Sequence, residues 1–225
     1  MILAAGFGER MRPLTEHTPK PLLKVGGKSL IEYHLENLSA AGISDVVINI
    51  AHLGEQIRNA LGNGKRWQLS IRYSVEPEPL ETAGAVLNAL PLLGDDPFLL
   101  INGDVWSDFS FASLLKQSMN SSLGHLVLVD NPVHHISGDF SLSDGFLAEK
   151  DITAYTFSGI SVLTPSLITD YPQCRDHFPL GEVFRYYLSQ RKITAEHYSG
   201  QWFDIGTVDR LHQLDNMLLS KECSE

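Results

Sequence analysis

Short runs of apolar residues alternate with amphipathic helical patterns through the first half of the chain. The apolar runs predict strands at 1–3, 45–51, 69–75 and 98–102. The amphipathic patterns predict one helix capped by Ser29 and ending at Gly42, and others at 54–61 and 81–90. This alternation is typical of βαβ units in a mostly parallel sheet. It therefore predicts a doubly wound, Rossmann-like α/β fold.

The pattern becomes less regular after Val105. Strands are expected at 125–129 and 155–163, a hairpin turn at 142–145, and helices at 180–190 and 207–219. The looser order predicts a mixed sheet. Since no repeat or change of composition marks a boundary, we expect a single domain. Within it, 1–104 and 199–225 would form a core and 105–198 a second part.

Composition and charge narrow the class of protein. The 225 residues are 43% hydrophobic and 20% charged, which is enough apolar material for a compact globule. Lysine and arginine number 17 against 27 aspartate and glutamate residues, a net charge of −10. This sign is wrong for covering a nucleic-acid backbone. We therefore expect no nucleic-acid partner and only local phosphate binding.

The chain shows no membrane or secretion signal. No apolar run approaches the roughly 18 residues that span a bilayer, and Glu9 and Arg10 interrupt the N-terminal apolar stretch too early for a signal peptide. Cys174 and Cys223 lack metal-binding spacing, which argues against a disulfide framework or a cysteine zinc site. We expect a cytoplasmic protein without membrane contact, present as a monomer or a weak dimer.

The segment 3–15 carries the strongest local signal. It follows the first strand and contains Gly6, Gly8, Arg10 and Arg12. Glycines let the backbone turn tightly and present N–H groups to an anion, and arginine forks match phosphoryl oxygens. The segment therefore predicts a phosphate site. The alternative is an ordinary strand-to-helix turn with two solvated arginines.

Two familiar phosphate motifs are excluded by counting. Met11 stands where a dinucleotide fingerprint needs its third glycine, and Leu22 where a Walker A motif needs its first. Lys20 lies between Pro19 and Pro21, which stiffen the chain around one cation and reduce the entropy lost when it is held over a ligand. The alternative for Lys20 is a surface turn.

Two aspartates are candidate metal ligands. Asp104 follows the strand 98–102, at the carboxyl end where open α/β sheets bind ligands. Mg²⁺ commonly takes one or two carboxylates together with substrate phosphates. Because one carboxylate holds Mg²⁺ weakly, Asp204, which is flanked by aromatic residues, is the predicted second ligand. The alternatives are an Asn-Gly-Asp turn at Asp104 and a turn or capping role for Asp204.

Other motifs carry less weight. Small residues at the start of the predicted helix 81–90 suit close approach to a flat base, and equally suit an ordinary helix N-terminus. His134 and His135 would point in opposite directions on a strand, and no zinc-binding spacing accompanies them. The sequence has no G-x-S-x-G elbow, so a covalent serine mechanism has no support.

Together these motifs resemble a known family. The stretch LAAGFGERMRPLT followed by PKPLLKVGGKSLIEYHL closely resembles the signature of sugar-1-phosphate nucleotidyltransferases, and PLETAG, INGD and WFDIGT appear in the family's order over most of the chain. The Glu81-Thr82 pair, HHISGDF and YTFSGI are most similar to the N-acetylmuramate 1-phosphate uridylyltransferases of bacterial cell-wall recycling. The resemblance implies a GT-A-like nucleotidyltransferase fold. Relatives usually have a few more residues before Leu3, so we expect a shortened first strand.

The resemblance implies a role for each matching residue. The catalytic residues would be Arg10, Lys20 and Asp104, and Mg²⁺ would be held by Asp104 and Asp204. The nucleotide would be bound by Ala4, Ala5, Gly6, Gly8, Arg10, Lys20, Glu81, Ala83, Gly84 and Asn102. The sugar phosphate would be bound by Asn102, Asp139, Glu149, Ser158 and Gly159, so that 105–198 is the sugar-binding part.

The implied reaction is a direct displacement in which a sugar 1-phosphate oxygen attacks the α-phosphorus of UTP. A phosphomonoester is already largely ionised at neutral pH, with a second pKa of about 6, so no general base is required. Three alternatives stay open. A guanylyl-, thymidylyl- or cytidylyltransferase would use the same chemistry, a GT-A-type glycosyltransferase would not need the stretch 6–20, and a non-catalytic nucleotide-sugar sensor would not need both aspartates.

Overall fold

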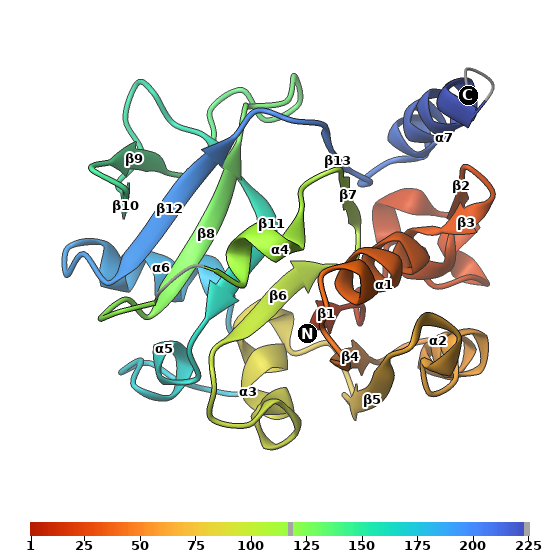
Figure 1. The fold of residues 1–225 in the computed structure, drawn as a ribbon, viewed down its shortest axis with the longest axis horizontal. Coiled ribbons are helices and arrows are strands. Elements are labelled where there is room, and N and C mark those ends of the chain that lie inside the picture. Colours follow the sequence, from red (N-terminus) through yellow and green to blue (C-terminus); the bar gives the residue numbers. More distant parts are fainter. Residues whose placement is uncertain (117–118, 223–225) are drawn as a thin grey trace. The chain divides into compact units, whose positions relative to one another are not determined.

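The computed structural model describes residues 1–116 and 119–222 (Figure 1). Its contacts divide the chain into two compact units. The first unit comprises Ile2–Pro79, Asn102–Ala112 and Gln201–Glu225, and the second comprises Met1, Leu80–Ile101 and Ser113–Gly200. The segment 80–101 groups by its contacts with 113–200. The functional division into 1–104 with 199–225 and 105–198 stays a prediction.

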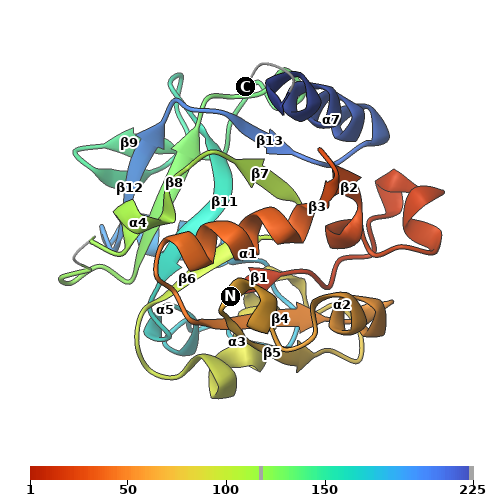
Figure 2. The same ribbon diagram turned by 45° about the vertical axis from the view of Figure 1, so that its right-hand side comes forward.

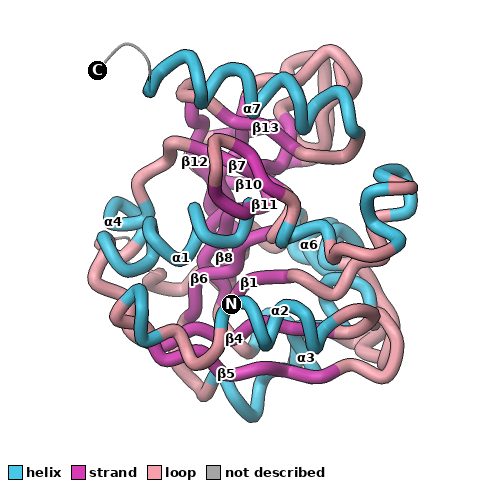
Figure 3. Tube along the Cα trace, turned by 90° about the vertical axis from the view of Figure 1, so that its right-hand side faces the viewer, coloured by secondary structure: helices cyan, strands magenta, loops and turns pink. Residues whose placement is uncertain are grey.

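The first unit contains a parallel sheet and two small antiparallel pairs. Its strands are β1 (Ile2–Leu3), β2 (Lys24–Val25), β3 (Lys28–Ser29), β4 (Asp45–Ile50), β5 (Ser70–Val75), β7 (Val105–Ser107) and β13 (Trp202–Asp204). Its helices are α1 (Leu30–Ala40), α2 (Gly54–Leu61) and α7 (Val208–Glu222). The parallel strands β5, β4 and β1 run side by side in Figure 3, while β7 pairs with β13 and β2 with β3.

The second unit is built on a mixed sheet. Its strands are β6 (Phe98–Asn102, with Asn102 assigned to the first unit), β8 (Gly124–Val129), β9 (Ser141–Ser143), β10 (Phe146–Ala148), β11 (Thr156–Leu163) and β12 (Ile193–Tyr198). They lie in the order β6-β11-β8-β12-β10-β9, and only β8 and β12 are parallel. The helices α3 (Glu81–Leu93), α5 (Ser166–Thr169) and α6 (Leu180–Leu188) belong to this unit, and α4 (Phe111–Leu114) lies at the division.

Helix α1 illustrates how local sequence signals fix an element. At its start, Glu32 Oε2 accepts hydrogen bonds from the backbone N–H of Ser29 at 2.9 Å and from its hydroxyl at 2.7 Å. This closes the helix N-terminus as in a capping box. At its end, Gly42 has a φ of +84°, a conformation that glycine adopts without strain. The buried face between them, which includes Leu35 and Leu38, anchors the helix.

Most of the expected elements are present. The turn at 142–145 joins β9 and β10, with positive φ at Asp144 (+51°) and Gly145 (+78°), as a tight hairpin requires. Helix α3 continues through Pro91 to Leu93, three residues beyond the expected end. Strands β7, β12 and β13 were not predicted, because they are short or carry polar residues that obscure an alternating pattern.

The structure also shows whether a helix could span a membrane and how the cysteines lie. Within residues 1–116 and 119–222, no helix has both the length and the apolar character that a bilayer span requires. Cys174 is exposed and its thiol is free. Cys223 lies outside the described residues.

Candidate active site

The segment after β1 is tied to the sheet by a buried chain of hydrogen bonds. The backbone N–H of Ala4 donates to Asn49 Oδ1 at 2.7 Å, and Asn49 Nδ2 donates to Glu76 Oε1 at 2.7 Å. Asn49 and Glu76 are each only 3% exposed, and Ala5 is also buried. Because buried polar groups are costly unless they are paired, this chain fixes where the segment 4–13 leaves the sheet.

The structure explains the glycine at position 8 but not the glycine at position 6. Gly8 has a φ of +64°, and a Cβ there would stand 2.9 Å from Thr15 Cγ2. The fold itself therefore requires glycine at position 8. Gly6 lies outside the positive-φ region, and among the described residues no atom other than those of its chain neighbours lies within 4 Å of where its Cβ would stand. The part of the chain that the structure describes therefore does not require glycine at position 6, which is compatible with close approach of a ligand to the backbone.

Lys20 and Arg10 supply the cations expected from the sequence. Arg10 lies on the surface in the short helical turn Glu9–Met11. Lys20 is only 9% exposed, and its Nζ lies 2.6 Å from Asp104 Oδ2. A largely buried ammonium needs an anionic partner, so the alternative of a surface turn does not describe Lys20.

The pairing of β7 with β13 brings the two predicted metal ligands together. Asp204 faces Val105 in this antiparallel pair, and the N–H of Ile205 donates to the carbonyl oxygen of Asp104 at 2.8 Å. Figure 2 shows β7 and β13 side by side, with α7 following β13. The two carboxylates therefore start from neighbouring points of one small sheet. Asp204 forms an ion pair with Arg210 of α7.

Asp104 also lies next to the glycine-containing segment. The N–H of Gly103 donates to the carbonyl oxygen of Leu3 at 2.8 Å, and a Cβ on Gly103 would stand 2.6 Å from that same oxygen. Only glycine permits this close backbone approach. Asn102, which is half-buried, directly precedes it. The basic segment and the two aspartates thus lie close to one another in the first unit, and their joint role in binding stays a prediction.

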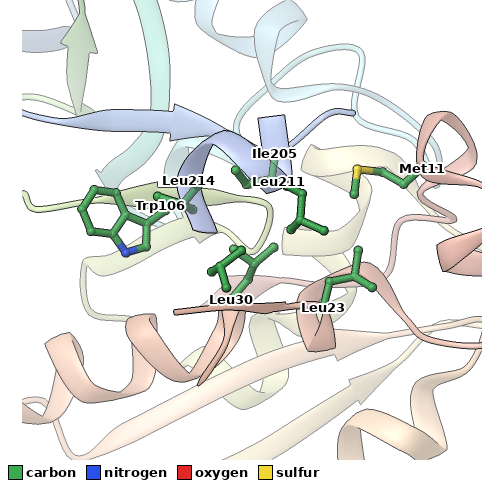
Figure 4. Close-up of a cluster of buried hydrophobic side chains, with 8 residues drawn as sticks. Met11, Leu23, Leu30, Trp106, Ile205, Leu211 and Leu214 are labelled. Carbon is green, nitrogen blue, oxygen red and sulfur yellow. The ribbon is translucent and has the colours of Figure 1, made fainter. Parts of the chain in front are cut away.

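A cluster of buried hydrophobic side chains includes the chain neighbours of several of these charged residues, and Figure 4 shows the cluster. Its buried members are Met11, Leu23, Val25, Leu30, Trp106, Ile205, Leu211 and Leu214. Met11 follows Arg10, Ile205 follows Asp204, and Leu211 follows Arg210. Burial of these apolar neighbours fixes the backbone at each charged residue, because well-packed side chains resist displacement.

His34 of α1 lies buried near Asp104. Burial lowers the pKa of His34 to about 4, although a hydrogen bond to the backbone of Val105 and the charge of Asp104 act to raise it. The imidazole is therefore neutral at pH 7. Its Nε2 has no hydrogen-bond partner among the described residues. Through its hydrogen bond to the backbone of Val105, His34 holds the start of β7.

The predicted base-contacting residues lie in the second unit. Glu81 begins α3 with a φ of +60°, an uncommon conformation for a residue with a Cβ. Ala83 and Gly84 are buried, and their N–H groups donate to the carbonyl oxygen of Phe178 at 2.9 and 3.2 Å. A Cβ on Gly84 would overlap the carbonyl oxygen of Asp176. Packing alone therefore accounts for glycine at position 84, and contact with a base stays a prediction.

The predicted sugar-contacting residues also lie in the second unit. Asp139 Oδ2 accepts the N–H of Phe157 at 2.9 Å, which fixes Asp139 beside the irregular stretch of β11 that contains Ser158 and Gly159. Ser158 is fully buried and its hydroxyl donates to Val127 at 2.7 Å. Glu149 is exposed in the loop after β10. The structure brings 139 and 157–159 together, and the sugar contacts stay predictions.

Sequence reasoning missed four residues of the first unit. Asn49 and Glu76 hold the glycine-containing segment, His34 supports β7, and Arg210 pairs with Asp204. Asn49 had a readable signal, since it is a polar residue in the otherwise apolar end of a strand. Glu76 and His34 had none, because each acts through a partner that is distant in the sequence. Arg210 follows Asp204 by only six positions, but no motif in the sequence pairs the two side chains.

The comparisons with known proteins agree with this geometry. The chain matches the nucleotidyl transferase family over residues 1–137. The chain belongs to the nucleotidyl transferase family, and the predicted enzyme class is confirmed. It is 45% identical over 222 residues, covering 95% of each chain, to an N-acetylmuramate alpha-1-phosphate uridylyltransferase from Neisseria meningitidis serogroup B.

Other relatives are more distant. The chain is 33% identical over 219 residues to a mannose-1-phosphate guanyltransferase from Schizosaccharomyces pombe, covering 92% of this chain but 60% of that longer one. A Bacillus anthracis protein described as a glucose-1-phosphate thymidylyltransferase has a similar fold, with a TM-score of 0.87 at 21% identity over 96% and 93% of the two chains. HddC from Yersinia pseudotuberculosis, solved with GMP-PN, gives a TM-score of 0.76 at 23% identity over 96% and 97%. These likenesses confirm the predicted mixed α/β nucleotidyltransferase fold.

Proposed function

We propose that this protein transfers a uridylyl group from UTP to N-acetylmuramate 1-phosphate, giving UDP-N-acetylmuramate and pyrophosphate. The observation that carries the proposal is the identity of 45% to the Neisseria uridylyltransferase over 95% of both chains. The guanyltransferase from Schizosaccharomyces pombe is both less similar and much longer than this chain. A muramate substrate would place the reaction in the recycling of peptidoglycan.

The chemistry needs positioning and charge neutralisation rather than a protein nucleophile. A phosphate oxygen of the sugar phosphate attacks the α-phosphorus of UTP, a P–O bond forms there, and the bond to the β-phosphate oxygen breaks as pyrophosphate leaves. Both reactants are polyanions that repel each other. Lys20 and Arg10 would neutralise phosphate oxygens, and the backbone N–H groups at Gly6 and Gly8 would orient them.

A divalent cation fits the acidic pair of the first unit. No group of three or more acidic, histidine or cysteine side chains is arranged as a complete metal site among the described residues. Two carboxylates completed by substrate phosphates are the arrangement that Mg²⁺ commonly uses. Asp104 and Asp204 start from paired strands, so we assign them to Mg²⁺. Bound there, Mg²⁺ would supply charge neutralisation of the phosphates.

The remaining assignments concern recognition of the two substrates. Glu81, Ala83 and Gly84 would contact the uracil base, and Asn102 would contact the ribose or the sugar. Asp139, Glu149, Ser158 and Gly159 would line the sugar pocket. The anchoring of Asp139 to Phe157 supports a preformed sugar site, since a fixed carboxylate loses little entropy when it binds hydroxyl groups.

A substrate panel tests the proposal. Pyrophosphate release would be measured with UTP, GTP, dTTP and CTP, each combined with the 1-phosphates of N-acetylmuramate, mannose and glucose. We expect the highest kcat/KM with UTP and N-acetylmuramate 1-phosphate, and dependence on an added divalent cation. Equal turnover with GTP and mannose 1-phosphate would overturn the specificity, and no pyrophosphate from any pair would favour a sensor without catalysis.

A further inference from the structure

Arg210 is a largely buried charged residue beside Asp204 that the proposed reaction has given no role so far. It lies in the first turn of α7, and its guanidinium forms an ion pair with Asp204. Its N–H and Nε also lie within 3.4 Å of Thr207 Oγ1. The side chain is 15% exposed and that of Asp204 is 27% exposed, so the pair is only partly screened by water.

The position of Arg210 carries an electrostatic cost. Cations in the first turn of a helix are destabilised by the helix dipole, whose positive end lies there. Asp204 offsets this cost in the protein without a metal. A cation that takes the Asp204 carboxylate weakens the ion pair between Asp204 and Arg210, so the guanidinium of Arg210 can then bind another anion.

A second guanidinium lies beside it. A Cβ on Gly206 would stand 3.0 Å from Arg210 Cζ and 3.3 Å from Arg10 Nη2, so the two arginines approach the same glycine. Two neighbouring guanidiniums repel each other unless an anion lies between them. Planar guanidinium forks match phosphoryl oxygens better than they match other common anions.

We propose that Arg210 is a positioning residue that exchanges partners during the proposed reaction: it holds Asp204 while no metal is bound, and joins Arg10 on phosphate oxygens once a divalent cation takes Asp204. The phosphate oxygens that fit are those of the leaving pyrophosphate, because these carry the charge that develops as the P–O bond breaks. This inference rests on the proposed function, since it assumes a metal on Asp204 and a pyrophosphate product.

The exchange predicts two opposite effects of removing Arg210. A divalent cation must displace Arg210 from Asp204, so loss of Arg210 makes binding of the cation tighter. Pyrophosphate loses one charged hydrogen-bond donor, so its binding becomes weaker. A purely structural role for Arg210 would weaken both kinds of binding, because a distorted site holds neither ligand well.

The test uses Arg210→Gln and, as a control, Arg66→Gln. Both remove one positive charge from the first unit, and Arg66 forms an exposed ion pair with Glu32. Binding of Mn²⁺ to the protein without nucleotide would be followed by electron paramagnetic resonance. Binding of inorganic pyrophosphate at saturating Mn²⁺ would be followed by calorimetry. Melting in EDTA would establish that each variant is folded.

For Arg210→Gln we expect Mn²⁺ affinity to rise by about fivefold and pyrophosphate affinity to fall by about tenfold. Arg66→Gln should leave both within about twofold of the parent protein. Unchanged or weaker Mn²⁺ binding in Arg210→Gln, or unchanged pyrophosphate binding, overturns the proposal. If Arg210→Gln fails to fold, Arg210→Lys replaces it. In Arg210→Lys the retained charge should keep the Mn²⁺ affinity near that of the parent protein. The loss of the guanidinium fork should weaken the binding of pyrophosphate. The opposite pattern overturns the proposal.

These binding measurements do not depend on which base or sugar the enzyme uses. A failed substrate panel with the expected shifts in binding would therefore contradict only the proposed function. A successful panel without the shifts would contradict only the role of Arg210.

Discussion

The ammonium group of Lys20 lies 2.6 Å from a carboxylate oxygen of Asp104, although 84 positions separate the two residues in the chain. The lysine side chain is 10% exposed and the aspartate side chain 41% exposed. The carboxylate therefore neutralises a buried cation from one side and faces solvent on the other. Because the carboxylate of Asp104 is already exposed, it can bind a metal without a rearrangement of the protein.

Replacing Asp104 by Asn tests the role of the carboxylate. Turnover should fall by on the order of 100-fold, because an amide is a poor ligand for a hard divalent cation. The free energy of unfolding should fall by about 1–3 kcal/mol without loss of the fold, because the largely buried ammonium of Lys20 loses its anionic partner while the amide oxygen still accepts its hydrogen bond. Pyrophosphate release and urea denaturation would be measured on the same preparation.

The matched control for that change is Asp144→Asn. Asp144 is 81% exposed in its side chain and lies at the turn between β9 and β10. Its substitution should leave kcat and the free energy of unfolding unchanged within error. Turnover near that of the parent protein in Asp104→Asn at saturating Mg²⁺ would contradict the assignment of Asp104.

Gly6 and Gly8 should respond differently to alanine. Gly8→Ala forces a Cβ to 2.9 Å from Thr15 Cγ2 at a φ of +64°, so it should lower the free energy of unfolding by about 1–3 kcal/mol. In Gly6→Ala the new Cβ has no atom of residues 1–116 or 119–222 within 4 Å apart from its chain neighbours, so the stability should change by less than about 1 kcal/mol.

The kinetics separate the two glycines further. If the backbone at Gly6 approaches the triphosphate, the added methyl group should raise KM for UTP by about tenfold in a fully stable protein. Steady-state kinetics and thermal melting of both variants check this. A stable Gly6→Ala variant with the KM of the parent protein would remove Gly6 from the nucleotide site.

Glu81→Gly tests whether a strained residue serves the base. Glu81 has a φ of +60°, so glycine should relieve strain and raise the free energy of unfolding by roughly 0.5–1 kcal/mol. We expect KM for UTP to rise severalfold at the same time, because the carboxylate assigned to the base is lost. Melting temperature and UTP kinetics are the measurements.

Gln68→Gly is the matched control, since Gln68 also has a φ of +60° but lies at the end of a short helical turn that contains none of the predicted site residues. It should gain similar stability with unchanged kinetics. Identical UTP kinetics in Glu81→Gly and Gln68→Gly would exclude a role for Glu81 in recognition.

His34 predicts a pH dependence of stability. Burial lowers the pKa of His34 in the folded protein from 6.5 to about 4, against the charge of Asp104. The unfolded chain therefore binds more protons between these values, and stability falls as the pH drops from 6.5 toward 4. The contribution is fully present above pH 6.5 and amounts to about 3 kcal/mol.

His34→Asn should flatten this part of the pH profile while keeping an N–H donor. His212→Asn, on the exposed side of α7, should leave the profile as it is in the parent protein. The free energy of unfolding, measured by urea denaturation at pH 4 to 8, distinguishes the variants. An unchanged slope in His34→Asn would show that another group controls acid unfolding.

The outcome for individual elements shows what can be read locally. The limits of α1 were predictable because Ser29, Glu32 and Gly42 each act on a backbone group within a few residues. The strand β6 was predictable because an unbroken apolar run needs burial on both faces. Position 204 was identified from its neighbours, but its place in a strand was not, since Trp202–Asp204 is only three residues long.

The sequence by itself determined the alternation of strands and helices, the family, and the residue types available for phosphate and metal chemistry, because these follow from spacing and motif over short stretches. Only the tertiary structure decided that Asp104 meets Lys20 and lies beside Asp204, that Asn49 and Glu76 hold the segment after β1, and that Arg210 pairs with Asp204. Apart from Arg210 and Asp204, which are six positions apart, these contacts join residues that are far apart in the chain. Their geometry depends on strand pairing and on the packing of a shared core, and no local pattern of residues encodes either.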